Sequence, residues 1–456
     1  MGTTSKKKDE VGEPVIQVGI LLDVQSVDFN LHTPYVVKGN EMEPGDYRVE
    51  ISDGRIAFNG ELFDELLFEA KNPHKDYFEL KDVIIGVNFH WERKENQQFL
   101  GSLKFIVSYK DEKPCLSAVD IVSVEDYLKS VISSEMSSTS SLELLKAHAI
   151  ISRSWLMSQI CKEEKSVGKS LADSEGSWKE TSTERIIWYD REDHDQFDVC
   201  ADDHCQRYQG ITRQTTDIVG RAVDETRGMV VTYDGKICDT RYSKCCGGMM
   251  ETFENVWEPV VHPYLQAKRD AMEESDLPNL CDEEQAEEWI MSSPKSFCNT
   301  NNTKVLKQVL NDYDTETSDF FRWKVTYSQE EIAEIIAEKS GIEFGNILDL
   351  EPIERGYSGR LIKLKVIGTD RVFTFGKELE IRRVLSRKHL YSSAFVVKPL
   401  DENDEGIPQK FEIYGAGWGH GVGLCQIGAA MMAEEGYSHD RILQHYFTDT
   451  ELTSMY

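Results

Sequence analysis

The chain has 456 residues, of which 40% are hydrophobic and 29% charged. This length and composition are ordinary for a globular protein of about two to four domains. Lysines and arginines number 51 against 81 aspartates and glutamates, so the formal net charge is −30. That excess of acid argues against nucleic acid or an anionic membrane as a partner, because both are themselves negatively charged. No stretch of the sequence approaches the roughly 20 apolar residues of a membrane span.

The first 13 residues are polar, and we expect them to be disordered. Their basic run is not followed by the apolar segment of a secretion signal. The sequence therefore shows no leader, so that either the protein is intracellular or its leader has been removed. Residues 14–110 predict a β-rich accessory domain, a small sheet or barrel with strands at 14–22, 47–52, 83–87 and 99–107.

Helices follow the β-rich region, and the first of them carries a carboxyl group on its apolar side. Ser123 is the expected N-cap, and the apolar stripe consists of Val124, Tyr127, Leu128, Val131 and Ile132. Glu135 continues this stripe, where desolvation would raise the pKa of its carboxyl group and suit it to general acid catalysis. The alternative is that Glu135 lies at a frayed helix end and points to water.

A second helix is expected from Ser140 to about residue 160. Ser140 and Glu143 have the spacing of a capping box, and the buried face would be formed by Leu142, Leu145, Ala149 and Ile150. Arg153 lies in the middle of this largely apolar helix and needs a partner, for which a carboxylate or a sugar hydroxyl would serve. Otherwise it is a surface arginine whose stem lies along the helix.

Residues 161–187 are polar and predict a loop, and a segment rich in cysteine and histidine follows it. His194, Cys200, His204 and Cys205 fall within twelve positions and are ligands of the kind that zinc prefers. Their spacing matches no common zinc finger. The alternatives are a disulfide between Cys200 and Cys205, or free thiols.

Strands are expected near 228–243, followed by the pair Cys245 and Cys246 and two glycines. Adjacent cysteines with no histidine close in sequence are a weak signal of a nucleophile, whereas paired glycines indicate a close approach of the backbone, as to a ligand. Tyr242 and Ser243 could line a cleft as hydrogen-bonding groups. Residues 266–320 are acidic and predict an insertion, with a cysteine at 281 and another at 298.

The C-terminal part predicts a helix at 329–339 that ends near Gly341, and strands near 361–367 and 371–375. Alternating glycines then surround Trp418 and His420. The segment lacks the Gly-Lys-Ser/Thr end of a phosphate-binding loop, so sugar or acyl chemistry is the better interpretation. A helix at 424–435 should end at Gly436, and Ser438 should begin the next one.

These pieces, in this order, resemble the stage II sporulation protein D family, also called the amidase-enhancer family. The resemblance rests on 124–155, 204–210, 246–257 and 417–429, of which the last is the most specific. It implies an α+β fold with a mixed helical and β-rich catalytic core formed by 111–265 and 321–456. The chain departs from the family pattern at Cys245, Cys246 and Cys425.

The resemblance also implies an activity, because the family's members resemble lytic transglycosylases that act on peptidoglycan strands already stripped of stem peptides. The family's catalytic acid is the glutamate before methionine in the first motif, here Glu135, which would act as general acid and then as base. The positions that match the family's cleft are Arg153, Tyr242, His420, Gln426 and Tyr446.

The resemblance further implies a metal in the Cys/His segment, which favours zinc there, and a location in the cell envelope or periplasm. A cell-wall amidase is the implied partner. Two other interpretations stay open: a glycan-binding module without catalysis that enhances an amidase, and a metal-stabilised structural protein with no glycan role.

Overall fold

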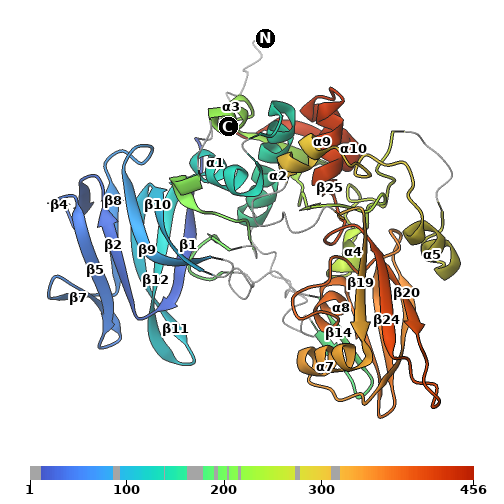
Figure 1. Ribbon diagram of the computed structural model, residues 1–456. Helices are drawn as coiled ribbons and strands as arrows, with labels where there is room; N and C mark the ends of the chain where they lie inside the picture. The colour runs from blue at the N-terminus through green and yellow to red at the C-terminus, as the bar shows by residue number, and fades with distance from the viewer. Residues whose placement is uncertain are drawn as a thin grey trace, which may run out of the picture.

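The computed structural model describes residues 12–85, 93–137, 139–161, 178–188, 194–202, 205–213, 217–272, 278–309 and 319–456. Figure 1 shows two β-rich regions on either side of a group of helices. The fold is therefore mixed α+β, as the sequence predicts. No helix in the described part of the chain is both long enough and apolar enough to cross a membrane.

The α-helices of the described residues are α1 (Val124–Glu135), α2 (Leu142–Ile160), α3 (Asp217–Glu225), α4 (Phe253–Val256), α5 (Glu283–Met291), α6 (Thr303–Val309), α7 (Gln329–Ser340), α8 (Glu378–Val384), α9 (Gln426–Glu434) and α10 (His439–Tyr446). A short 3-10 helix covers Gly210–Arg213.

Two sheets form the N-terminal region, drawn at the left of Figure 1. The first has the order β15 (Val199–Cys200), β1 (Val15–Val24), β12 (Lys113–Ser123), β11 (Ser102–Lys110), β8 (Glu65–Ala70), β3 (Tyr35–Val37) and β4 (Asn40–Met42). The second has the order β10 (Arg93–Leu100), β9 (Tyr77–Ile85), β2 (Ser26–Leu31), β5 (Gly45–Ser52), β6 (Arg55–Phe58) and β7 (Glu61–Phe63).

Aromatic side chains join the two sheets. The ring of Phe29 on β2 lies 5.1 Å from that of Phe68 on β8 and 5.3 Å from that of Phe105 on β11. The strands expected at 14–22 and 47–52 are confirmed. The strand expected at 99–107 is divided at Gly101, which has a φ of +98° and approaches the carbonyl of Ile121 too closely for a side chain. Of the strand expected at 83–87, residues 83–85 lie in β9 and the rest fall outside the described residues.

Strand β12 leads directly into α1, and the expected N-cap is confirmed because the Ser123 hydroxyl accepts a hydrogen bond from the Asp126 amide. The expected N-cap of α2 is wrong by one residue. Ser141 caps this helix through the amide of Leu144, while the Ser140 hydroxyl donates to the carbonyl of Gln308. A distant segment has thus taken over the side chain that local sequence assigned to the cap.

Two short sheets continue the helical part. One has the order β17 (Lys236–Ile237), β16 (Met229–Tyr233) and β26 (Glu451–Ser454). The other pairs β18 (Tyr242–Ser243) with β25 (Leu424–Cys425) in parallel, so that Tyr242 lies opposite Leu424 and Ser243 opposite Cys425. This pairing brings residues that are about 180 positions apart side by side.

Two further sheets form the region at the right of Figure 1. The first has the order β13 (Trp178–Glu180), β14 (Glu184–Ile187), β22 (Val372–Gly376), β21 (Leu361–Gly368) and β20 (Ile347–Arg355). The second has the order β19 (Arg322–Ser328), β24 (Lys410–Ala416) and β23 (Phe395–Leu400). The core between them includes Ile332, Ile336, Leu364, Phe375, Ile381 and Phe411.

Several expectations for this region can be checked. The loop expected at 161–187 is wrong for its last part, because β13 and β14 pair with each other and β14 adds to β22; residues 162–177 lie outside the described residues. The helix expected at 329–339 is confirmed, with a capping box at Ser328 and a left-handed Gly341 at its end. The strands expected near 361–367 and 371–375 are confirmed. The division of the chain into domains stays a prediction.

Candidate functional site

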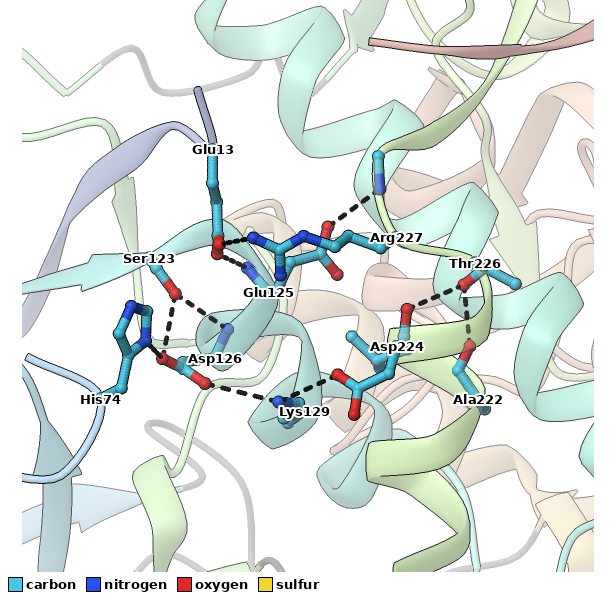
Figure 2. A network of polar contacts seen from close by, with 12 residues as sticks. Glu13, His74, Ser123, Glu125, Asp126, Lys129, Ala222, Asp224, Thr226 and Arg227 are labelled. Atoms are coloured by element: carbon cyan, nitrogen blue, oxygen red, sulfur yellow. Dashed lines mark hydrogen bonds and ion pairs between the residues drawn. The ribbon is translucent and has the colours of Figure 1, made fainter. Parts of the chain in front are cut away.

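A network of polar contacts fixes the start of α1, as Figure 2 shows. The Asp126 carboxylate accepts from the Ser123 hydroxyl at 3.0 Å and contacts the His74 ring at 2.6 Å. One turn later the Lys129 ammonium group lies 3.2 Å from the carboxylate of Asp224, near the C-terminal end of α3. Helix α1 is thus tied to the N-terminal region on one side and to α3 on the other.

Glu125, in the first turn of α1, forms a buried ion pair with Arg153 of α2. The guanidinium donates to both carboxylate oxygens, at 2.9 and 2.6 Å, and a third donor reaches the carbonyl of Met229 at 3.0 Å. Side-chain exposure is 0% for Arg153 and 2% for Glu125. The carboxylate partner considered for Arg153 is therefore confirmed. Its expected place in a substrate cleft is at odds with the structure, because a guanidinium buried in this way does not reach a ligand.

Glu135 is the last residue of α1 and is half-buried, whereas the apolar stripe before it is fully buried. Its position lies between the two sequence interpretations, since it is neither fully buried nor fully exposed. Burial raises the pKa of Tyr127 well above its usual range, and the nearby groups of Cys205, Tyr242, Cys200 and Glu135 add to the shift. These four groups, from three segments of the chain, therefore lie within electrostatic range of one buried phenol.

Tyr242, Gln426 and a buried histidine form a second contact chain. The ring of Tyr242 meets that of His148 edge-on at 4.6 Å. The Gln426 side-chain nitrogen lies 3.0 Å from His148 Nε2, and the Ser152 hydroxyl lies 3.3 Å from His148 Nδ1. Burial, with a smaller effect of the Lys244 charge, lowers the pKa of His148 to about 3. His148 is therefore neutral at physiological pH, and because an amide nitrogen only donates, its Nδ1 carries the proton.

His420 lies in the glycine-rich loop beside Trp257, with the two ring centres 4.8 Å apart. Its Nδ1 accepts from the Val422 amide at 3.0 Å. Burial, followed by the charges of neighbouring arginines, lowers the pKa of His420 to about 3. Ser243 is close to this loop, and its hydroxyl has no hydrogen-bond partner among the residues that the structure describes. Both groups thus offer neutral hydrogen-bonding atoms.

Tyr446 lies apart from these groups, since it is 2% exposed and its hydroxyl donates to the Asp270 carboxylate at 2.8 Å. It packs in the core of α10 rather than lining a surface. Among the expected site residues, the structure therefore gathers Tyr242, Ser243, His420 and Gln426 around the β18–β25 pairing. Glu135 and Tyr242 both lie within electrostatic range of Tyr127. Arg153 and Tyr446 are buried and contribute to the packing of the fold instead.

Arg360 is a residue of this site that sequence reasoning missed. Its guanidinium donates to the carbonyls of Gly419 and Cys246 and is fully buried. A Cβ at Gly421 would lie 2.4 Å from the centre of this guanidinium, and Gly421 has a φ of +75°. The alternating glycines signalled a close approach, but nothing near Arg360 in sequence marked it as the group approached.

Glu251 is a second residue that sequence reasoning missed. It has 0% exposure, and its carboxylate accepts from the Ser358 amide at 3.0 Å, the Ser358 hydroxyl at 2.6 Å and the Asn255 side chain at 2.8 Å. It ties the third motif to the turn that carries Arg360. Its only sequence signal was its place directly after the paired methionines.

The Cys/His segment has the arrangement of a metal site. The ligand atoms of His194, Cys200 and Cys205 all lie within 4.8 Å of one another, and Cys205 Sγ is 3.5 Å from His194 Nε2. Pairing of β15 with β1 holds Cys200 in place. Cys200 and Cys205 are not joined by a disulfide in this structure, so that alternative is wrong here. His204, the expected fourth ligand, lies outside the described residues.

Comparison with known proteins adds two family matches. Residues 112–233 match the family described as Stage II sporulation protein, and residues 251–423 match a domain of unknown function. The first match contains Glu135 and the Cys/His segment, and the second contains the glycine-rich loop as far as Gly423. Tyr242 and Ser243 lie between the two.

Three relatives show the extent of the similarity. An uncharacterized protein of Brachyspira hyodysenteriae is 26% identical over 355 residues, which cover 78% of this chain and 72% of the relative. The amidase enhancer of Bacillus subtilis is 24% identical over 72% of this chain but only 40% of its own length. The stage II sporulation protein D of Bacillus amyloliquefaciens is 23% identical over 74% of this chain and 76% of its own.

Breaking the buried ion pair between Glu125 and Arg153 should destabilise the fold. Replacing Arg153 by methionine should lower the free energy of unfolding by about 3–5 kcal/mol, because Glu125 is left as an unpaired buried charge. The matched control, Arg48→Met, breaks an exposed pair with Asp28 and should cost less than about 1 kcal/mol. Urea denaturation of both variants measures the difference. A Glu125→Met, Arg153→Met double variant should regain part of the lost stability. If Arg153→Met and Arg48→Met lowered the free energy of unfolding equally, the proposed role of the buried pair would be contradicted.

Because His148 is buried in its neutral form, the stability of the fold should depend on pH. Its pKa is about 3 in the folded chain and about 6.5 when unfolded, so the unfolded chain binds the extra proton as the pH falls. His148 therefore stabilises the fold fully above pH 6.5 and loses this contribution between about 6.5 and 3. At pH 5 the loss should reach about 2 kcal/mol. The stability of His148→Gln should fall less between pH 7 and 5 than that of the wild type; parallel curves would show that His148 is not held neutral.

Proposed function

Because the chain belongs to the stage II sporulation protein D and amidase-enhancer family, we propose that it cleaves the glycan strands of bacterial peptidoglycan as a lytic transglycosylase. The observation that carries the proposal is that Glu135, from the first motif, and Tyr242, near the third, lie within electrostatic range of the same buried Tyr127. The names of the relatives support a cell-wall role and, for this chain, a place in the cell envelope. The substrate would be strands from which an amidase has removed the stem peptides.

One carboxyl group suffices for the proposed reaction. Protonated Glu135 donates its proton to the glycosidic oxygen between MurNAc and GlcNAc, and the C1–O bond breaks. The resulting Glu135 carboxylate takes the proton from the C6 hydroxyl of the same MurNAc as this oxygen bonds to C1. The products are a 1,6-anhydro end and a free GlcNAc hydroxyl. No water and no second carboxylate take part, unlike the two-carboxylate hydrolases.

The neighbouring groups would bind the sugars. Neutral, half-buried His420 offers hydrogen bonds without a charge that the glycan would have to neutralise. The Ser243 hydroxyl is buried beside this loop and would support its position rather than reach the sugar. The half-buried rings of Trp257 and Tyr242 offer apolar faces to the sugar rings. Gln426 would act one step away, by holding His148 against Tyr242.

The Cys/His group is proposed as a structural zinc site. His194, Cys200 and Cys205 fit zinc by ligand type and by their mutual distances, and His204 is the proposed fourth ligand. Such a closed site would supply folding energy rather than catalysis. It would fix the chain just before Tyr208, whose ring stacks on Tyr127 at 4.9 Å and so supports the inner side of α1.

The catalytic role is tested with Glu135→Gln, which keeps the size of the side chain but removes the proton donor. Wild-type protein incubated with denuded glycan strands should release anhydro-MurNAc products, detected by mass spectrometry. Loss of general acid catalysis should slow their release by at least about 100-fold in the variant. The control is Glu330→Gln, an exposed helical glutamate in the region of α7, which should leave the rate unchanged.

Two results would count against the proposal. Undiminished product from Glu135→Gln would remove Glu135 from the mechanism. Binding of strands by the wild type with no product would instead favour the second candidate, a glycan-binding module that enhances a cell-wall amidase, as the name of the Bacillus subtilis relative suggests.

The zinc site is tested with a His194→Ala, Cys205→Ser double variant. Because both changes remove ligands of one ion, the zinc content of the purified chain should fall by one equivalent, measured by plasma mass spectrometry. A Cys161→Ser variant, which changes an exposed thiol outside the group, is the control and should keep the wild-type content. Unchanged zinc in the double variant would contradict the site.

A further inference from the structure

Three buried thiols and one buried carboxylate meet at a second point of the molecule. Cys246 precedes two glycines, Cys298 lies between α5 and α6, and Cys425 is the N-cap of α9. Asp270 comes from the segment before α5. Their ligand atoms all lie within 4.8 Å of one another, and each residue is at most 2% exposed. The sequence had marked Cys246 and Cys425 as departures from the family pattern and Cys298 as one of the two cysteines of the 266–320 segment.

The distances fit one metal ion better than a disulfide. The Sγ atoms of Cys246 and Cys298 are 3.6 Å apart, whereas a disulfide bond is about 2.0 Å long. Two thiolates on one zinc, each at about 2.3 Å in a tetrahedral arrangement, lie about 3.8 Å apart. In a polynuclear iron–sulfur cluster the thiolates on different irons lie further apart, because each iron takes its own ligands.

The hydrogen bonds around these four side chains are typical of metal ligands rather than of thiols packed in an apolar core. Cys425 Sγ accepts a hydrogen bond from the Cys246 amide at 3.2 Å. The Asp270 oxygens accept from the Cys298 amide at 2.9 Å and from the Tyr446 hydroxyl at 2.8 Å. Such contacts orient ligands around a metal. They leave lone pairs on the carboxylate for an ion.

A cation without a carboxylate partner lies beside the group. The Arg322 guanidinium donates to the carbonyls of Ser292, Gly247, Phe321 and Trp289, and within the described residues it forms no ion pair. It is within electrostatic range of Cys298 and Cys246. Three thiolates, one carboxylate and Zn²⁺ sum to a charge of −2, so a buried guanidinium is suited to this neighbourhood.

We propose that Cys246, Cys298, Cys425 and Asp270 bind one zinc ion, separate from the Cys/His group. The ion would join three distant segments behind the β18–β25 pairing, since Cys425 lies opposite Ser243 in that pairing and Cys246 follows three residues after Ser243. It would thus fix the positions of Tyr242 and Ser243 on β18 and of Gln426 at the start of α9. The site does not depend on the cleavage chemistry proposed above.

The test is the metal content of the full chain, purified under reducing conditions with no added metal. Wild-type protein should hold two equivalents of zinc, and the His194→Ala, Cys205→Ser variant should keep one. Adding Cys298→Ser to that variant should remove the last equivalent. Cobalt in the double variant should show thiolate-to-cobalt charge-transfer absorption, which Cys298→Ser abolishes. Cys238→Ser, which removes a buried thiol outside both groups, is the matched control and should keep both equivalents.

Several outcomes would overturn the proposal. Absence of metal from the His194→Ala, Cys205→Ser variant with an intact circular dichroism spectrum is one. A disulfide between two of Cys246, Cys298 and Cys425, found by peptide mapping of chain purified without reductant, would show a covalent bond in place of the ion. Two further variants test Asp270 as the fourth ligand. The Asp270→Asn variant should lose the zinc of this site, whereas the Cys245→Ser variant, which changes the neighbouring thiol, should keep it. Zinc lost from Cys245→Ser but kept by Asp270→Asn would overturn the ligand set.

Discussion

The buried pair of Glu125 and Arg153 is the interaction on which the position of the candidate site depends. It joins the first turn of α1 to the middle of α2, and the Gly228 amide also donates to Glu125. A buried ion pair gives little net stability, because desolvating both charges offsets their attraction. What it does give is a fixed geometry. Glu135 lies ten residues further along the same helix, about 15 Å away, so the pair fixes one end of a rigid element whose other end carries the proposed acid.

The other motifs fold around this helix for reasons that the contacts make clear. Tyr208 stacks on Tyr127 and donates to Asp120, whose pKa burial raises well above its usual range. The Gln209 amide donates to the Ser130 hydroxyl on α1. The third and fourth motifs meet through two strands of two residues each, and the fully buried guanidinium of Arg360 holds their loops together. Short strands of this kind are held by their surroundings rather than by their own pairing.

Local sequence predicted those features that depend on local physics. The stripe of α1 and its Ser123 cap follow from helical periodicity, and the end of α7 follows from Gly341. The failures have long-range causes. Gln308 took over the expected cap Ser140, and β14 formed because β22, nearly 200 residues later, offered a parallel edge. Arg153 matched a family position, but only the structure shows that Glu125 occupies its guanidinium. Neither charge pattern nor periodicity could have paired these residues.

The electrostatics of the site keep its two histidines neutral at pH 7. An imidazole is the usual acid near neutral pH, and two histidines lie among the site residues. Burial lowers the pKa of both His148 and His420 to about 3, so that neither is present as an imidazolium acid at pH 7. Their neighbours also favour the neutral imidazole, since Val422 donates to one ring nitrogen of His420 and Gln426 to one of His148. Burial therefore makes both histidines neutral hydrogen-bonding groups, and the proposed mechanism leaves proton transfer to Glu135.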